Sequence, residues 1–148
     1  MSAPVSVVHL RQVQDYQFDV EFASDLPTWR VDEPPPLGQG QGPTPVQLLA
    51  AAVGNCLSDS LLFALRKFRQ QPEPIEAEVR AETGRNAEGR VRVLKIEATL
   101  RLGVPAASLE HLDRVLATFE AYCTVTQTVG ASVPITVRVV DRDGVVVK

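Results

Sequence analysis

The 148-residue chain is 45% apolar and 22% charged, and its formal net charge is −3. This length and composition predict a single globular domain, residues 1–148, with enough apolar side chains for one hydrophobic core. The charge balance lacks the basic excess with which proteins bind nucleic acids or membrane surfaces, so we expect neither partner.

The number of cysteines and the N-terminal sequence together predict the cellular compartment of the protein. The first 16 residues lack the apolar stretch of a signal peptide. Two cysteines in a chain without such a signal predict a reducing environment, where thiols serve catalysis, bind metals or pack in a core. We therefore expect a cytoplasmic protein.

Three short strands are predicted at the N-terminal end, followed by a loop. Residues 5–13 and 16–23 carry strand patterns, the second with clear alternation, and residues 28–32 are a third candidate. Residues 33–43 hold four prolines and three glycines, a density that regular structure does not tolerate. This loop is either a solvated linker or a segment lying against the molecule at the rim of a pocket.

A long helix is predicted over residues 44–70, with Thr44 as its N-cap and Pro45 at its first position. Its apolar stripe comprises Leu48, Leu49, Ala52, Val53, Cys56, Phe63 and Ala64. The polar residues that interrupt it are Asn55, Ser58, Asp59 and Ser60. Because a membrane span needs about 20 mostly apolar residues, a buried core helix is favoured.

A hairpin and a second helix are predicted next. Strands 75–83 and 91–102 alternate apolar and polar residues, and a phase change of one residue predicts a β-bulge near Val93–Leu94. Ser108 is the predicted cap of the second helix, and Glu110 and Arg114 have the spacing of an exposed ion pair on it. The apolar stripe of this helix comprises Leu109, Leu112, Leu116, Phe119 and Cys123.

Further helical turns are predicted within residues 124–132, and a last strand over residues 135–140. The order of elements is that of an α+β protein with a mostly antiparallel sheet and one exceptional helix.

The chemistry open to this chain centres on its two cysteines, Cys56 and Cys123. Neither they nor His9 and His111 show metal-ligand spacing, so we expect no metal site, and no motif indicates a cofactor. Each cysteine is either a core residue or a redox-active thiol, and composition leaves both interpretations open. Polar residues adjoin both cysteines, which favours a small cleft lined by both segments.

A reactive thiol must ionise, which a nearby cation promotes. Arg30 is the candidate, because the strand that carries it leads into the loop before the long helix. Arg66 and Lys67 follow Cys56 by about 15 Å along the helix and are judged too far away.

Two segments carry a family resemblance. GPTPVQLLAAAVGNC, residues 42–56, and YCTVTQ, residues 122–127, resemble the OsmC/Ohr family of osmotically induced proteins and organic hydroperoxide resistance proteins. The resemblance implies an intertwined α+β homodimer with the cysteine-bearing helix buried at its centre. The all-round apolarity of that helix also predicts a dimer.

The resemblance further implies roles for the thiols. In the peroxidases of this family an organic hydroperoxide oxidises one cysteine to a sulfenic acid, a second cysteine forms a disulfide with it, and a dithiol reduces the disulfide. Cys56 matches the first position and Cys123 the second, and Arg30 loosely matches the arginine that holds the thiolate. The family's glutamate falls at Val46 or Gln47, and neither is acidic.

Two functions are consistent with these residues. The first is a thiol-dependent peroxidase acting on organic hydroperoxides. The alternative is a non-catalytic dimer that binds a small apolar or thiol-containing ligand, which the missing carboxylate at Val46 and Gln47 favours.

Overall fold

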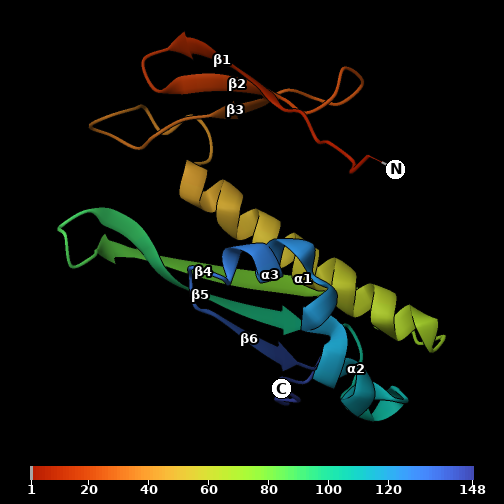
Figure 1. Cartoon of the computed structure of the whole chain (residues 1–148). Coiled ribbons are helices and arrows are strands. Elements are labelled where there is room, and N and C mark those ends of the chain that lie inside the picture. Colours follow the sequence, from red (N-terminus) through yellow and green to blue (C-terminus); the bar gives the residue numbers. More distant parts are fainter. Residues whose placement is uncertain (1) are drawn as a thin grey trace. The chain divides into compact units, whose positions relative to one another are not determined.

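The structure is a computed structural model that describes residues 2–148 (Figure 1). The chain divides into two compact units, the first ending at Leu48 and the second spanning Leu49–Lys148. The long helix α1, Pro45–Lys67, begins in the first unit and continues through the second.

The first unit contains a three-stranded antiparallel sheet of β1 (His9–Gln14), β2 (Gln17–Glu21) and β3 (Trp29–Val31), paired in that order. All three predicted strands are confirmed, although β1 begins later than expected. Within the predicted strand 16–23, Val20 is buried whereas Tyr16 and Phe22 are exposed.

The proline- and glycine-rich loop folds around one buried carboxylate, Asp32. Its oxygens accept the backbone N–H groups of Glu33 at 2.8 Å, Gln39 at 3.1 Å and Gln41 at 3.1 Å. Burial of Asp32 opposes ionisation, but these donors outweigh it and hold the pKa of the carboxyl below its ordinary value. A Cβ at Gly38 would lie 2.2 Å from Asp32 Oδ1, so only glycine fits there. As predicted, residues 33–43 form no helix or strand.

Helix α1 begins with a capping box. Thr44 Oγ1 accepts the N–H of Gln47 at 3.2 Å, and Gln47 Oε1 accepts the N–H of Thr44 at 2.9 Å, which satisfies two donors that a helix start otherwise leaves free. The predicted cap and the predicted Pro45 start are confirmed.

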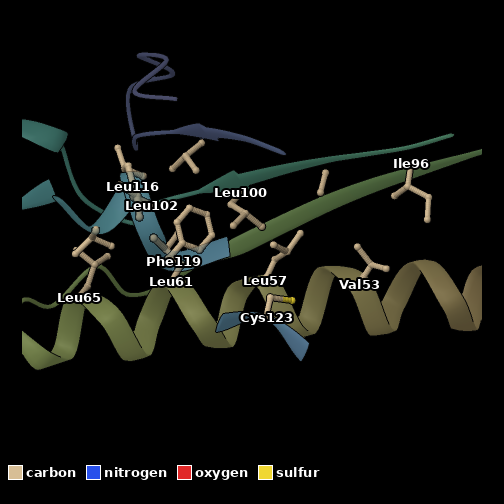
Figure 2. Close-up of a cluster of buried hydrophobic side chains, with 13 residues drawn as sticks. Val53, Leu57, Leu61, Leu65, Ile96, Leu100, Leu102, Leu116, Phe119 and Cys123 are labelled. Atoms are coloured by element: carbon tan, nitrogen blue, oxygen red, sulfur yellow. The ribbon is translucent and has the colours of Figure 1, made fainter. Parts of the chain in front are cut away.

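The buried face of α1 differs from the predicted stripe. Val53, Leu57, Leu61 and Leu65 point from the helix into the core, as Figure 2 shows, and none of them is exposed to solvent. Phe63, placed on the stripe from the sequence, is 68% exposed. The helix is apolar on several sides, so the periodicity did not single out the face that the sheet covers.

By length and composition, α1 is also apolar enough to cross a membrane. The polar interruptions therefore do not exclude a span by themselves. Core helices of globular proteins meet the same criterion, and the leucines of α1 pack in a core.

The second unit contains β4 (Glu76–Arg85), β5 (Val91–Arg101) and β6 (Ile135–Val140), paired in that order. The pairing of β4 with β5 passes from Glu82–Lys95 to Thr83–Val93. Leu94 is thus left without a partner, and the predicted bulge is confirmed.

The predicted antiparallel character is confirmed for three of the four strand pairings, and only β6 runs parallel to its neighbour, β5. The predicted single sheet is wrong, because residues 2–148 form two three-stranded sheets. A parallel neighbour requires a crossover connection, which residues 102–134 provide.

That crossover contains four short helical elements: the 3-10 turns η1 (Ala106–Ser108) and η2 (Phe119–Tyr122), and the helices α2 (Leu112–Thr118) and α3 (Thr124–Val129). The helical turns predicted within residues 124–132 are confirmed. The predicted Ser108 cap is wrong, because α2 begins only after His111, which has a φ of 62°. Glu110 lies before the helix, so the expected pair with Arg114 does not form on it.

The core of the second unit lies between α1, the crossover and β5. Alternate residues of β5 and its extension face it, namely Ile96, Ala98, Leu100 and Leu102. Phe119 and Cys123 from the crossover complete it, and Figure 2 shows both beside α1. The second cysteine is therefore a core residue, as its stripe predicts.

Candidate thiol site

Cys56 lies in the middle of α1, at a cleft of about 660 Å³. The side chain is half-buried, and it packs against the core while lining the cleft. The walls of the cleft come from α1, α2 and η2 and include the rings of Phe63, Phe68 and Tyr122. A small molecule in the cleft can therefore reach the Cys56 thiol.

Cys123 lies where η2 passes into α3, and it is completely buried. Its sulfur accepts the backbone N–H of Thr126 at 3.4 Å and so caps α3. Its thiol donates to Thr126 Oγ1 at 2.9 Å. Thr126 is itself buried.

The structure brings the two predicted cysteines together. Burial raises the pKa of the Cys123 thiol, and the neighbouring Cys56 thiol raises it further, whereas the hydroxyl and N–H of Thr126 lower it. Both cysteines are free thiols. The one that lines the cleft is backed by one with no route to solvent, an arrangement suited to oxidation of Cys56 followed by attack from Cys123.

Charged side chains of both signs line the cleft. Asp59, one turn beyond Cys56, lines it near the thiol. Lys67 places its ammonium 5.8 Å from the centre of the Phe63 ring, and Arg114 places its guanidinium 5.5 Å from that of Phe68. These cation–π contacts hold positive charge towards the far end.

Sequence reasoning missed most of this lining. The sequence predicts that Lys67 is too distant from Cys56 and that Arg114 belongs to a surface pair, yet both line the cleft. The sequence did contain a signal for this lining. Phe63 and Lys67 are spaced so that they lie on one side of α1, and this side also carries Cys56 and Asp59.

Arg30 lies on β3 in the first unit. Its Nε donates to Asp19 Oδ1 at 2.8 Å, and its Nη1 donates to Gln17 Oε1 at 3.2 Å. The assignment of Arg30 as the cation that serves Cys56 stays a prediction.

Gln47, one of the two residues at the glutamate position of the resemblance, has a structural role. Its side-chain oxygen is engaged by the Thr44 N–H at the start of α1. Among residues 2–148, no three His, Cys, Asp or Glu side chains cluster so as to hold a metal ion.

Comparison with models of protein families shows to which family the chain belongs. The profile of the OsmC-like proteins matches residues 38–138, which include both cysteines and most of the second unit. The chain belongs to the OsmC-like family. Comparison with curated protein sequences gives no match.

Solved structures with this fold are numerous and distant in sequence. An OsmC-like protein from Mycoplasma pneumoniae is 12% identical, with a TM-score of 0.77 over 95% of this chain and 99% of its own. A hypothetical protein from Aquifex aeolicus VF5 is 18% identical, with a TM-score of 0.75 over 94% and 97%. The organic hydroperoxide resistance protein OsmC from Legionella pneumophila is 15% identical, with a TM-score of 0.70 over 94% and 98%. These similarities establish an α+β OsmC-like fold with a long central helix and two sheets.

Proposed function

We propose that this protein is a thiol-dependent peroxidase that reduces organic hydroperoxides through a Cys56 sulfenate and a Cys56–Cys123 disulfide. The observation that carries the proposal is the proximity of a thiol at a cleft to a second, fully buried thiol in the same core. Family members with this fold include organic hydroperoxide resistance proteins from Legionella pneumophila and Bacillus subtilis.

In the first step, the thiolate of Cys56 attacks the distal oxygen of the hydroperoxide. The O–O bond breaks, the sulfur gains the oxygen and is oxidised by two electrons, and the alkoxide leaves and takes up a proton to become an alcohol. The apolar walls of the cleft suit the organic part of such a substrate.

In the second step, the sulfur of Cys123 attacks the sulfur of the Cys56 sulfenic acid. The S–S bond forms, hydroxide leaves, and the proton of the Cys123 thiol converts it to water. A dithiol reductant then returns both cysteines to thiols by exchange, and is itself oxidised to a disulfide. Both half-reactions balance without a metal or a further cofactor.

Two further parts of the proposal rest on the family resemblance. Arg30 is the residue we assign to stabilise the Cys56 thiolate, and the active form is a homodimer. The apolar face of α1 that includes the exposed Phe63 supports the second point, because a partner subunit would cover it.

The test is peroxide consumption by the purified protein with tert-butyl hydroperoxide as substrate and dihydrolipoamide as reductant. Wild-type protein is expected to turn over repeatedly, and Cys56→Ser to fall to the uncatalysed rate. With the reductant left out, Cys123→Ser is expected to consume about one equivalent and stop at a sulfenic acid, seen by intact mass as one added oxygen. Wild-type consumption no faster than that of Cys56→Ser would refute the proposal.

A second arginine, Arg11, provides the matched control for Arg30. Arg30→Met is expected to slow the oxidation of Cys56 while both thiols stay in place. Arg11 lies on β1, opposite the same Asp19 of β2, and Arg11→Met is the control with unchanged rate. Equal rates of Cys56 oxidation in the two variants would show that Arg30 does not stabilise the Cys56 thiolate.

A second candidate function is a non-catalytic dimer that holds a small apolar or thiol-containing ligand. The observation in its favour is that Val46 or Gln47 stands where the resemblance has a glutamate, and neither is acidic; the side chain of Gln47 is bound to the Thr44 N–H. Native mass spectrometry of the purified protein separates the two functions. A retained ligand together with slow alkylation of Cys56 would favour binding, whereas an empty cleft and fast alkylation favour the peroxidase.

A further inference from the structure

Thr126 contacts the buried sulfur of Cys123 through two different groups, its side-chain hydroxyl and its backbone N–H. Its Oγ1 lies 2.9 Å from Sγ, and its backbone nitrogen lies 3.4 Å from the same atom. Both residues are buried, so water does not substitute for either contact. Of the two cysteines, Cys56 lines the cleft and Cys123 does not.

The two contacts respond differently when Cys123 loses its proton. The N–H of Thr126 donates to the sulfur in either state. The thiol donates to Oγ1, but a thiolate has no proton to give, so the hydroxyl must turn and donate instead. A hydroxyl, unlike an amide or a carbonyl, can serve as acceptor in one state and donor in the other.

We propose that Thr126 is a positioning residue that stabilises the thiolate of Cys123, through its hydroxyl together with its N–H, in both halves of the thiol–disulfide cycle. This inference rests on the proposed peroxidase function for its catalytic meaning. The hydrogen-bond geometry on which it stands is independent of that function.

The stabilised thiolate matters twice. When Cys123 attacks the Cys56 sulfenic acid, the proton of its thiol must leave and the sulfur's electron pair forms the S–S bond. When a dithiol attacks the sulfur of Cys56 in the disulfide, the S–S bond breaks and Cys123 departs with that electron pair. Thiolates that are more stable leave faster, and thiols with a larger ionised fraction attack more often.

A purely structural role of Thr126 predicts different behaviour. The cap of α3 requires only the backbone N–H of Thr126 and the sulfur of Cys123. Replacing the hydroxyl with a methyl group of similar size keeps that cap. Thr126→Val therefore isolates the hydroxyl, and Thr126→Ser restores it.

The test is a titration of a single thiol. In a Cys56→Ser background Cys123 is the only cysteine, and its ultraviolet thiolate absorbance is followed against pH with the double Cys→Ser variant as blank. Since a hydrogen bond to a charged group is lost, adding Thr126→Val is expected to raise the midpoint by about one pH unit. Thr126→Ser is expected to leave it near the parent value.

Thr128 provides the matched control. Its hydroxyl donates to the backbone oxygen of Thr124 on the exposed side of the same helix, and Thr128→Val removes it without touching sulfur. The control is expected to leave the midpoint unchanged. An unchanged or lowered midpoint in the Thr126→Val protein overturns the proposal, and Thr126→Ala serves as the test variant if valine does not fold.

A second measurement follows the cycle in protein with both cysteines. After one equivalent of tert-butyl hydroperoxide, rapid quenching and intact mass separate sulfenate formation from disulfide formation. Thr126→Val is expected to slow the disulfide step about threefold near neutral pH, because the smaller thiolate fraction is partly offset by a more nucleophilic thiolate, with sulfenate formation unchanged. Equal disulfide rates would refute the role, whereas a wild type that forms neither sulfenate nor disulfide would refute the peroxidase and leave the titration to decide on Thr126.

Discussion

The side chain of Asp141 joins two separate stretches of backbone in the second unit. Its oxygens accept the N–H groups of Ala106, Asp143 and Val145, each at 2.9 Å. The carboxylate thereby anchors the start of η1 and the turn that follows β6. Because a buried carboxylate with three donors is stabilised only when ionised, it should govern the acid sensitivity of this unit.

The pH dependence has a definite sign. The N–H of Ala106 is the largest cause that lowers the pKa of Asp141 below its ordinary 3.8, with those of Val145 and Asp143 adding to it and burial opposing them. A depressed folded-state pKa stabilises the protein above 3.8, and that stabilisation is lost as the pH falls through the folded value. Asp141→Asn is expected to lower the free energy of unfolding at neutral pH and to flatten its decline below pH 3.8.

Urea titrations of the two proteins at neutral and acid pH measure this directly. The matched control is Asp143→Asn, two residues away, because Asp143 is exposed and its carboxylate contacts only Arg142 at 3.6 Å. Equal acid sensitivity in Asp141→Asn and the wild type would contradict the assignment.

At the residue scale, part of the site was predictable from sequence. Cys56 and Cys123 stand in recognisable segments, and polar neighbours marked both. The role of Thr126 was not predictable, because it depends on Cys123 being buried at the start of α3 with its sulfur aimed at that hydroxyl. Such a contact arises from packing rather than from local periodicity.

At the scale of elements, the approach of α1 to β4 depends on a glycine. A Cβ at Gly54 would lie 2.6 Å from Cγ2 of Val79 and 3.8 Å from Cβ of Ala77. Gly54 is two residues before Cys56, so this close approach also sets the position of the thiol on the helix. Val79 is β-branched and has little freedom to move aside.

Gly54→Ala should therefore be unfavourable even though alanine is the better helix former. The gain in helix propensity is about 1 kcal/mol, and overpacking costs roughly 1–3 kcal/mol, so a net loss of about 0–2 kcal/mol is expected. With Val79→Ala already present, the obstructing methyl is absent, and the same change should stabilise the protein by about 1 kcal/mol. A double-mutant cycle in urea tests this reversal, and stabilisation by Gly54→Ala alone would contradict it.

The elements themselves were predictable in unequal measure. The α1 start and the bulge at Leu94 follow from local rules, a capping box and a phase change, and both are confirmed. The buried face of α1 did not follow, since apolar residues occupy several of its sides. The parallel pairing of β6 with β5 did not follow either, because register between distant strands is set by the crossover.

At the scale of the whole molecule, large apolar side chains stay exposed in each unit. Leu10 and Trp29 are about half exposed in the first, and Phe63 and Tyr122 are 68% and 78% exposed in the second. Two of these rings line the cleft that contains Cys56. Aromatic residues gathered in this way are typical of interfaces between subunits.

The proposed homodimer leads to the last prediction. Light scattering coupled to size-exclusion chromatography is expected to give twice the mass of the chain. Phe63→Arg places a charge on the exposed face of α1 and should shift the population to monomer, because burying an unpaired charge at an interface is unfavourable. Val91→Arg, at an equally exposed apolar position in the β4–β5 hairpin, should leave the dimer intact. A wild-type mass equal to one chain would refute the dimer, and dissociation by Val91→Arg but not by Phe63→Arg would place the interface away from α1.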